Sequence, residues 1–124
     1  MKQAMQALLI APDAAMRRDI VDGEKCITIR EGHRDYRLGP VMLCCHLEPW
    51  AVMADIISVR HTTFGGLRMD EIHDDGCAKQ QDLFDLLLRF YPELKPHSDV
   101  TVIRWEKVRG ALVPSPPQRQ EVDR

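Results

Sequence analysis

The sequence lacks a Cys-x-x-Cys pair, a spacing found in many zinc and redox sites. Its four cysteines lie at positions 26, 44, 45 and 77. Cys44 and Cys45 are adjacent, and adjacent residues of a strand point to opposite faces, so these two suit neither a disulfide nor a shared metal ion. We therefore expect free thiols, as in proteins of the reducing cytoplasm.

Long apolar runs are also absent. The longest ones are far too short to cross the hydrocarbon core of a bilayer. The first residues show no basic region followed by an apolar stretch and a small-residue cleavage site, which a signal peptide would have. We expect no membrane association and no secretion.

The chain also lacks a large excess of either positive or negative charge. Lysine and arginine number 17 against 19 aspartates and glutamates, which gives a net charge of −2 and an isoelectric point near 6.2. This balance excludes a global basic field that would hold the protein on nucleic acid. Any contact with nucleic acid must be local, and a free nucleoside fits this charge better than a long duplex RNA.

What the chain does contain is typical of one soluble globular domain. It has 124 residues, of which 44% are hydrophobic and 29% charged, and it has no internal repeats. The last eleven residues carry three prolines among polar and charged neighbours and cannot bury much surface. We expect one domain over residues 1–110 and a disordered tail over residues 111–124.

The patterning predicts several short strands mixed with two or three helices. Asp13 can cap a helix that Gly23 ends, and Pro92 terminates a later helix with leucines at helical spacing. The expected strands are residues 5–10, 25–31, 41–47, 50–63 (bent or bulged near Asp55) and 99–108, and the expected helices are 13–22, 68–75 and 82–90. Without regular βαβ alternation, this order favours an α+β domain, a small mixed β-barrel flanked by two to three helices.

The stretch from Gly23 to Arg30 is the most informative part of the chain. Ile27 and Ile29 point one way along the predicted strand, whereas Thr28 and Arg30 point the other. A strand that buries two isoleucines therefore displays a hydroxyl and a guanidinium together. This face is a candidate floor for a site that binds a polar or anionic ligand, and an ordinary edge strand with a polar outer face is the alternative.

This stretch, Gly-x-Lys-x-Ile-Thr-Ile-Arg, resembles the signature of ASCH domains, small RNA-associated modules with a PUA-like fold. The resemblance covers about residues 6 to 108. Its further elements are Tyr36-x-x-Gly39, Asp75-Gly76, Phe90-Tyr91-Pro92 and the strand from Val100 to Ile103. Within the family, the chain is most similar to the small bacterial N(4)-acetylcytidine amidohydrolases, so the resemblance implies a PUA-like barrel and hydrolysis of an acetyl amide.

In those amidohydrolases the catalytic set is a lysine, a threonine three residues on, and a glutamate before the second helix. The lysine matches Lys25 and the threonine Thr28. The glutamate matches Asp75 after one inserted residue, with Asp74 as a substitute, and aspartate is one methylene shorter. A further departure is Pro40, where the family usually has an aspartate.

Two routes to amide hydrolysis stay open for this set. A neutral Lys25 could take the proton of Thr28 as its oxygen attacks, or Lys25 and a carboxylate could activate water that Thr28 orients. Residues three apart on a regular strand face opposite sides, so Lys25 must lie in the turn before the strand, or a bulge must intervene. Arg30 could supply a nearby cation, or bind a phosphate or the base carbonyl of the substrate.

Other residues are candidates for substrate contacts. Arg34 and Tyr36 lie in a polar loop beside the strand, where an arginine could contact ribose or phosphate and a tyrosine could stack on a base. His73 could assist proton transfer. The acidic run around Glu71 and His73 suggests a solvated helix face rather than a metal cluster, so we expect no metal and no cofactor.

The sequence thus predicts a cytoplasmic protein, monomeric or weakly dimeric, whose partner is a nucleoside or single-stranded RNA. Its most concrete function is removal of the acetyl group from N(4)-acetylcytidine. A non-catalytic RNA-binding module and a ribonuclease that uses the same cleft are the alternatives, and the acidic net charge favours a small-molecule substrate over both.

Overall fold

The computed structural model describes residues 5–10, 13–45 and 47–110. The predicted tail, residues 111–124, lies outside the described residues. Strands and helices are mixed along the chain, which confirms the predicted α+β class. No helix of the described residues is long and apolar enough to cross a membrane.

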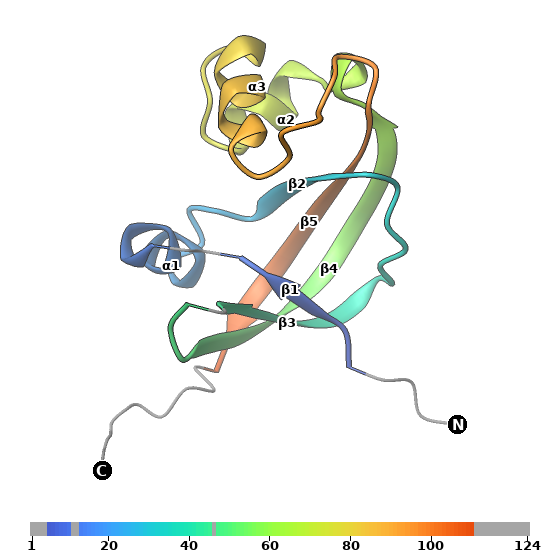
Figure 1. The fold of residues 1–124 in the computed structure, drawn as a ribbon. Coiled ribbons are helices and arrows are strands. Elements are labelled where there is room, and N and C mark those ends of the chain that lie inside the picture. The colour runs from blue at the N-terminus through green and yellow to red at the C-terminus, as the bar shows by residue number, and fades with distance from the viewer. Residues whose placement is uncertain (1–4, 11–12, 46, 111–124) are drawn as a thin grey trace.

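One five-stranded sheet forms the body of the described chain, with the strand order β1-β3-β4-β5-β2. The strands are β1 (Ala7–Leu9), β2 (Ile27–Glu31), β3 (Gly39–Cys45), β4 (Trp50–Thr63) and β5 (Asp99–Arg109). β1 pairs with β3 in parallel, and the other neighbours are antiparallel. The register shifts between Met53 and Asp55 and again between Ile56 and Ser58, which confirms the irregularity expected near Asp55. The sheet curls into a half-barrel (Figure 1).

Three α-helices and a short 3-10 turn complete the described chain: α1 (Ala14–Val21), η1 (Phe64–Gly66), α2 (Met69–Asp74) and α3 (Gln80–Leu88). Asp13 caps α1 as predicted, since its carboxylate accepts a hydrogen bond from the main-chain N–H of Met16 at 2.8 Å. α3 begins two residues earlier than predicted and ends at Leu88, well before Pro92. Figure 1 shows α2 and α3 together at one end of the sheet and α1 apart from them.

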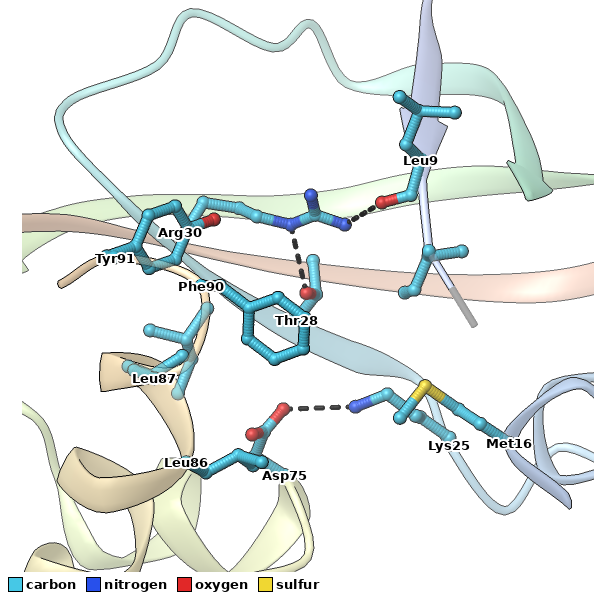
Figure 2. A pocket seen from close by; sticks show the side chains of 12 residues that line it. Leu9, Met16, Lys25, Thr28, Arg30, Asp75, Leu86, Leu87, Phe90 and Tyr91 are labelled. Carbon is cyan, nitrogen blue, oxygen red and sulfur yellow. Dashed lines mark hydrogen bonds and ion pairs between the residues drawn. The ribbon is translucent and has the colours of Figure 1, made fainter. Parts of the chain in front are cut away.

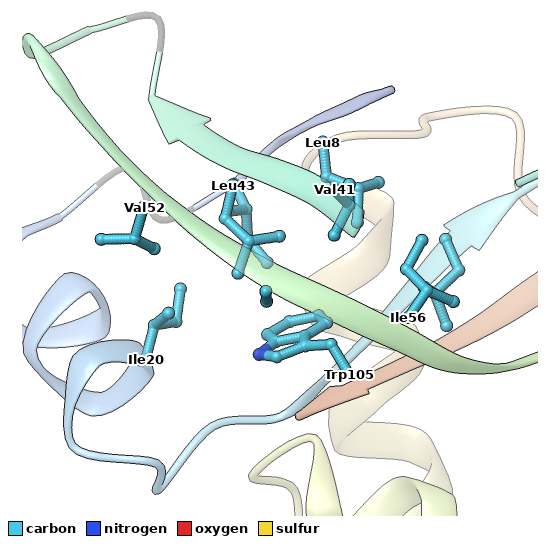
Figure 3. Close-up of a cluster of buried hydrophobic side chains, with 10 residues drawn as sticks. Leu8, Ile20, Val41, Leu43, Val52, Ile56 and Trp105 are labelled. Carbon is cyan, nitrogen blue, oxygen red and sulfur yellow. The ribbon is translucent and has the colours of Figure 1, made fainter. Parts of the chain in front are cut away.

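Two clusters of buried side chains hold these elements together. The first lies inside the curled sheet, where Trp105 and Ile20 of α1 pack with residues of β1, β3 and β4 (Figure 3). The second joins Ile27 and Ile29 of β2 to Leu83 and Leu87 of α3. Trp105 is buried, and Trp50 packs against the first cluster from a partly buried position. The two isoleucines of β2 therefore anchor the strand that carries the candidate site.

A side chain links the two outer strands of the sheet, β1 and β2. The guanidinium of Arg30, on β2, donates a hydrogen bond to the main-chain carbonyl of Leu9, on β1. Because β1 and β2 stand at opposite ends of the strand order, this bond spans the gap that the curled sheet leaves open. We call this gap the seam.

Candidate active site

A pocket of about 260 Å³ lies at the seam, where β1, β2, α1 and the α3 region meet. Its four polar lining residues are Lys25, Thr28, Arg30 and Asp75. Figure 2 shows Thr28 and Arg30 on the side of β2, with Asp75 facing Lys25 across the pocket. Its remaining lining residues are apolar or aromatic: Leu9, Ile10, Met16, Ile29, Leu86, Leu87, Phe90 and Tyr91. The pocket thus combines an amine, a hydroxyl, a guanidinium and a carboxyl with an apolar wall.

Lys25 reaches this pocket because it precedes the strand instead of belonging to it. α1 ends at Val21, and Gly23 takes a φ of +83°, a left-handed conformation that glycine adopts easily. The main-chain N–H groups of Glu24 and Lys25 both donate to the carbonyl of Asp19, at 2.8 and 3.1 Å. The strand begins only at Ile27, so the predicted start at residue 25 is two residues early. Lys25 and Thr28 can therefore line one pocket without a bulge.

Asp75 arrives from the end of α2. It is the C-cap residue of that helix, and Gly76 follows with a φ of +101°, which turns the chain away. The carboxylate of Asp75 accepts a hydrogen bond from the Lys25 Nζ at 3.0 Å, and the two side chains are only 9% and 14% exposed. Asp74, the substitute considered from the sequence, instead pairs with Arg104 at 2.8 Å and is 52% exposed. The structure therefore brings Asp75, and not Asp74, to the pocket.

The electrostatics of Asp75 favour a proton. Burial raises the pKa of its carboxyl above the ordinary value of 3.8, although the charge and hydrogen bond of Lys25 and the charge of Arg30 act in the opposite direction. A carboxyl that burial inclines toward its neutral form, beside a lysine in an apolar pocket, is suited to exchange a proton with that lysine.

Arg30 binds protein atoms on two sides. Its Nε donates to the Oγ1 of Thr28 at 3.2 Å, and another nitrogen of the guanidinium donates to the carbonyl of Leu9. Because Arg30 donates to Thr28, the hydroxyl of Thr28 can direct its own hydrogen elsewhere, and a developing negative charge on Oγ1 would be stabilised.

The aromatic wall of the pocket was not predicted from the sequence. Phe90 and Tyr91 line the pocket just beyond the end of α3, and Phe90 is 59% exposed. In the sequence Phe90 continues the helical spacing of buried leucines, a pattern that indicates a core residue. The pair Phe90-Tyr91 before a proline, which is part of the family resemblance, was the available signal.

Three predicted substrate contacts are not among the residues that line the pocket. Tyr36 packs, partly buried, against the first hydrophobic cluster. Arg34 donates from its Nε to the carbonyl of Glu31 and from its main-chain N–H to Thr101. His73 lies 3.2 Å from the carbonyl of Ala78 through its Nε2. In place of Tyr36, the structure puts Phe90 and Tyr91 beside the catalytic candidates.

The predicted solvated acidic face around α2 is wrong for Glu71. This side chain is 1% exposed and makes a bidentate ion pair with Arg60 of β4, with distances of 2.7 and 2.8 Å. Periodicity does not reveal the pair, because its two members lie on different elements. In the described residues, no three His, Cys, Asp or Glu side chains are grouped so that they could hold a metal ion.

In comparisons with known proteins, no family model and no curated protein matches this chain. The likeness to ASCH domains therefore rests on the residues quoted above.

Proposed function

We propose that this protein is an amidohydrolase of the ASCH type, with a PUA-like barrel, that removes the acetyl group from N(4)-acetylcytidine in the cytoplasm. One observation carries the proposal: Lys25, Thr28 and Asp75, which come from three separate parts of the fold, line the same pocket. They are an amine, a hydroxyl and a carboxyl, the set that the resemblance implies, with aspartate in the position of the glutamate.

The chemistry begins with the Lys25–Asp75 pair. The carboxyl of Asp75 lies 3.0 Å from the Lys25 Nζ, so it is the group that accepts the proton of Lys25 and leaves a neutral amine. The amine then takes the hydroxyl proton of Thr28 as Oγ1 attacks the acetyl carbon. Arg30, which donates to Oγ1, favours the ionised oxygen.

The amide bond then breaks. The carbon–N4 bond cleaves, Lys25 returns the proton to N4, and cytidine leaves with a free amino group while the acetyl group stays on Thr28 as an ester. Water hydrolyses this ester to acetate and restores the hydroxyl. In the second route water attacks directly, Thr28 orients it, and no ester forms.

The pocket suits a small aromatic substrate. Ligand pockets commonly enclose roughly 300 to 1,000 Å³, so a volume of about 260 Å³ lies just below this range and suits a single base. The aromatic side chains of Phe90 and Tyr91 provide faces on which a base can stack.

The test is to incubate the purified protein with N(4)-acetylcytidine and to quantify cytidine and acetate by chromatography. We expect release of both in equal amounts, and we expect Lys25→Ala and Thr28→Ala to abolish it while the circular dichroism spectrum is unchanged. Lys79→Ala is the matched control, because this exposed lysine precedes α3 and is not among the pocket residues. Unchanged rates in both pocket variants would refute the mechanism.

A parallel incubation with labelled single-stranded RNA separates the alternatives. Cleaved RNA without released acetate would identify a ribonuclease. Binding that weakens steeply with salt, without turnover of either substrate, would identify an RNA-binding module.

A further inference from the structure

The register of β2 against β5 fixes which main-chain groups of β2 face the seam. In an antiparallel pair, opposed residues alternate between those that exchange hydrogen bonds and those that do not. The main-chain N–H of Trp105 donates to the carbonyl of Cys26 at 3.0 Å, and the main-chain N–H of Gly32 donates to the carbonyl of Asp99 at 2.7 Å. In β2, the even-numbered residues therefore direct their main-chain N–H and C=O groups toward β5. Ile27, Ile29 and Glu31 therefore direct their N–H and C=O groups away from β5.

A hydrogen bond outside the ladder agrees with this alternation. The carbonyl of Glu31 accepts from the Nε of Arg34 at 2.9 Å, so it is not used by β5. β2 stands at the end of the strand order, and no other described strand pairs with its outer edge. Among the described residues, the main-chain N–H of Ile29 has no hydrogen-bond acceptor.

Ile29 lies beside the reacting groups. It directly follows Thr28, and it is one of the pocket residues although its side chain belongs to the second buried cluster. Ile27 has the same side chain, the same buried cluster and the same outward main chain, but it is not among the pocket residues. Among these two outward-facing positions, position 29 is therefore the one that combines a place in the pocket with an N–H that no described residue accepts.

We propose that the main-chain N–H of Ile29 is the oxyanion donor of this site, an inference that rests on the proposed amide hydrolysis. When the oxygen of Thr28 or of water bonds to the acyl carbon, the electron pair of the C=O bond moves to the acyl oxygen. The N–H of Ile29 donates to that oxygen until the pair returns and the carbon–N4 bond breaks. Both routes place the negative charge on the same atom, so the donor serves either one.

Placing the donor in the residue after the nucleophile has a physical advantage. The N–H is held by the same strand that holds the hydroxyl, so the two move together and need no reorganisation during the reaction. A donor on an open sheet edge also loses no internal hydrogen bond when it binds substrate.

The test replaces single amide linkages by esters, with the α-hydroxy acid analogue of isoleucine installed in the full-length protein at position 29 or at position 27. Each ester removes one N–H and keeps the side chain. Each ester also makes one carbonyl that faces β5 a weaker hydrogen-bond acceptor: that of Thr28 for position 29 and that of Cys26 for position 27. The two variants therefore weaken the hydrogen bonds between β2 and β5 to the same extent. Equal melting temperatures for the two variants will show that the comparison is matched.

We expect the ester at position 29 to lower kcat by about 10² to 10³-fold, with little change in KM, and the ester at position 27 to stay near the wild-type rate. Equal rates for the two variants, with an active wild type, would overturn the oxyanion assignment and leave the proposed function standing. An inactive wild type would overturn the proposed function, and the oxyanion assignment with it.

A second measurement does not depend on turnover of the ester variants. In the Thr28→Ala protein saturated with N(4)-acetylcytidine, the amide proton resonance of Ile29 should move further than that of Ile27, because only the first would bind the acyl oxygen. A resonance of Ile29 that stays in place at saturation would contradict the proposal.

Discussion

Helix α2 carries a buried acidic side chain at each end, and the two behave in opposite ways. Glu71, in the first turn, pairs with Arg60, and its Oε1 also accepts from the main-chain N–H of Arg68 at 2.7 Å. Asp75, at the C-terminal cap, accepts from Lys25 through one oxygen. Both carboxylates are buried, and both face a cation from another element.

The pKa values of the two groups shift in opposite directions. Burial raises the pKa of Glu71, but the hydrogen bonds from Arg60 and Arg68 together with their charges outweigh it, so its pKa falls below the ordinary value. For Asp75 burial outweighs the effects of Lys25 and Arg30, so its pKa rises. The donors differ as well: Glu71 accepts from the guanidinium of Arg60 and from the main-chain N–H of Arg68, whereas Asp75 accepts from the amine of Lys25.

The largest effect should come from removing the proton-exchanging carboxyl. Asp75→Asn is expected to lower kcat/KM for N(4)-acetylcytidine by about 10² to 10⁴-fold, the usual contribution of a general acid or base. Its circular dichroism spectrum should match that of the wild type, since asparagine keeps a side-chain oxygen that can accept from the Lys25 Nζ. A variant that keeps the wild-type rate would remove Asp75 from the mechanism.

The second largest effect is expected when the Arg60–Glu71 ion pair is removed. Arg60→Ala leaves Glu71 buried without its main donor and is expected to lower the free energy of unfolding by about 3 kcal/mol. Urea denaturation measures this change in the free energy of unfolding. Arg104→Ala is the control, because its partners Asp70 and Asp74 are more than half exposed and the expected loss is under about 1 kcal/mol. Equal losses in the two variants would erase the distinction between the pairs.

Asp75 and Glu71 should also make the free energy of unfolding change with pH in opposite directions. A carboxyl whose pKa is raised by folding binds its proton more tightly in the folded state, so Asp75 makes the free energy of unfolding fall as the pH rises above 3.8. Glu71, whose pKa is lowered, contributes stability that is present above 4.5 and is lost as the pH falls below it.

These slopes are measured by urea denaturation between about pH 3 and pH 7. The difference between the wild type and Asp75→Asn should fall with rising pH above 3.8, and the difference between the wild type and Glu71→Gln should rise with pH up to 4.5. Two differences that change in the same direction would contradict the assignment.

The smallest effect is expected for a change at Asp74, the residue next to Asp75. Asp74→Asn removes an exposed ion pair with Arg104 and should change the free energy of unfolding by less than about 1 kcal/mol. The rate of acetylcytidine hydrolysis should not change, because Asp74 does not line the pocket. A loss of rate comparable to that of Asp75→Asn would show that the wrong carboxyl had been assigned.

Local pattern accounts for much of the fold. The alternation in β2, the cap at Asp13 and the glycine turn at Gly23 act between residues close in sequence, and their predictions agree with the structure to within about two residues. The same local rules put Lys25 and Thr28 near each other, once the glycine turn is taken into account. The helix expected over residues 82–90 ends at Leu88, and Phe90 just beyond it is exposed, because helical spacing alone does not show where a helix ends or which residues the rest of the fold covers.

By itself, the sequence determined where the strands and helices lie to within about two residues, and it pointed to Lys25, Thr28 and Arg30, which the structure places in one pocket, since neighbouring residues interact whatever the rest of the chain does. Only the tertiary structure decided which acidic side chain pairs with which basic side chain. It placed Asp75 at Lys25 and Glu71 at Arg60, pairs that join separate elements. It also left the outer edge of β2 at the seam unpaired with any other described strand, because the pairing of a sheet edge depends on elements that lie far away in the sequence.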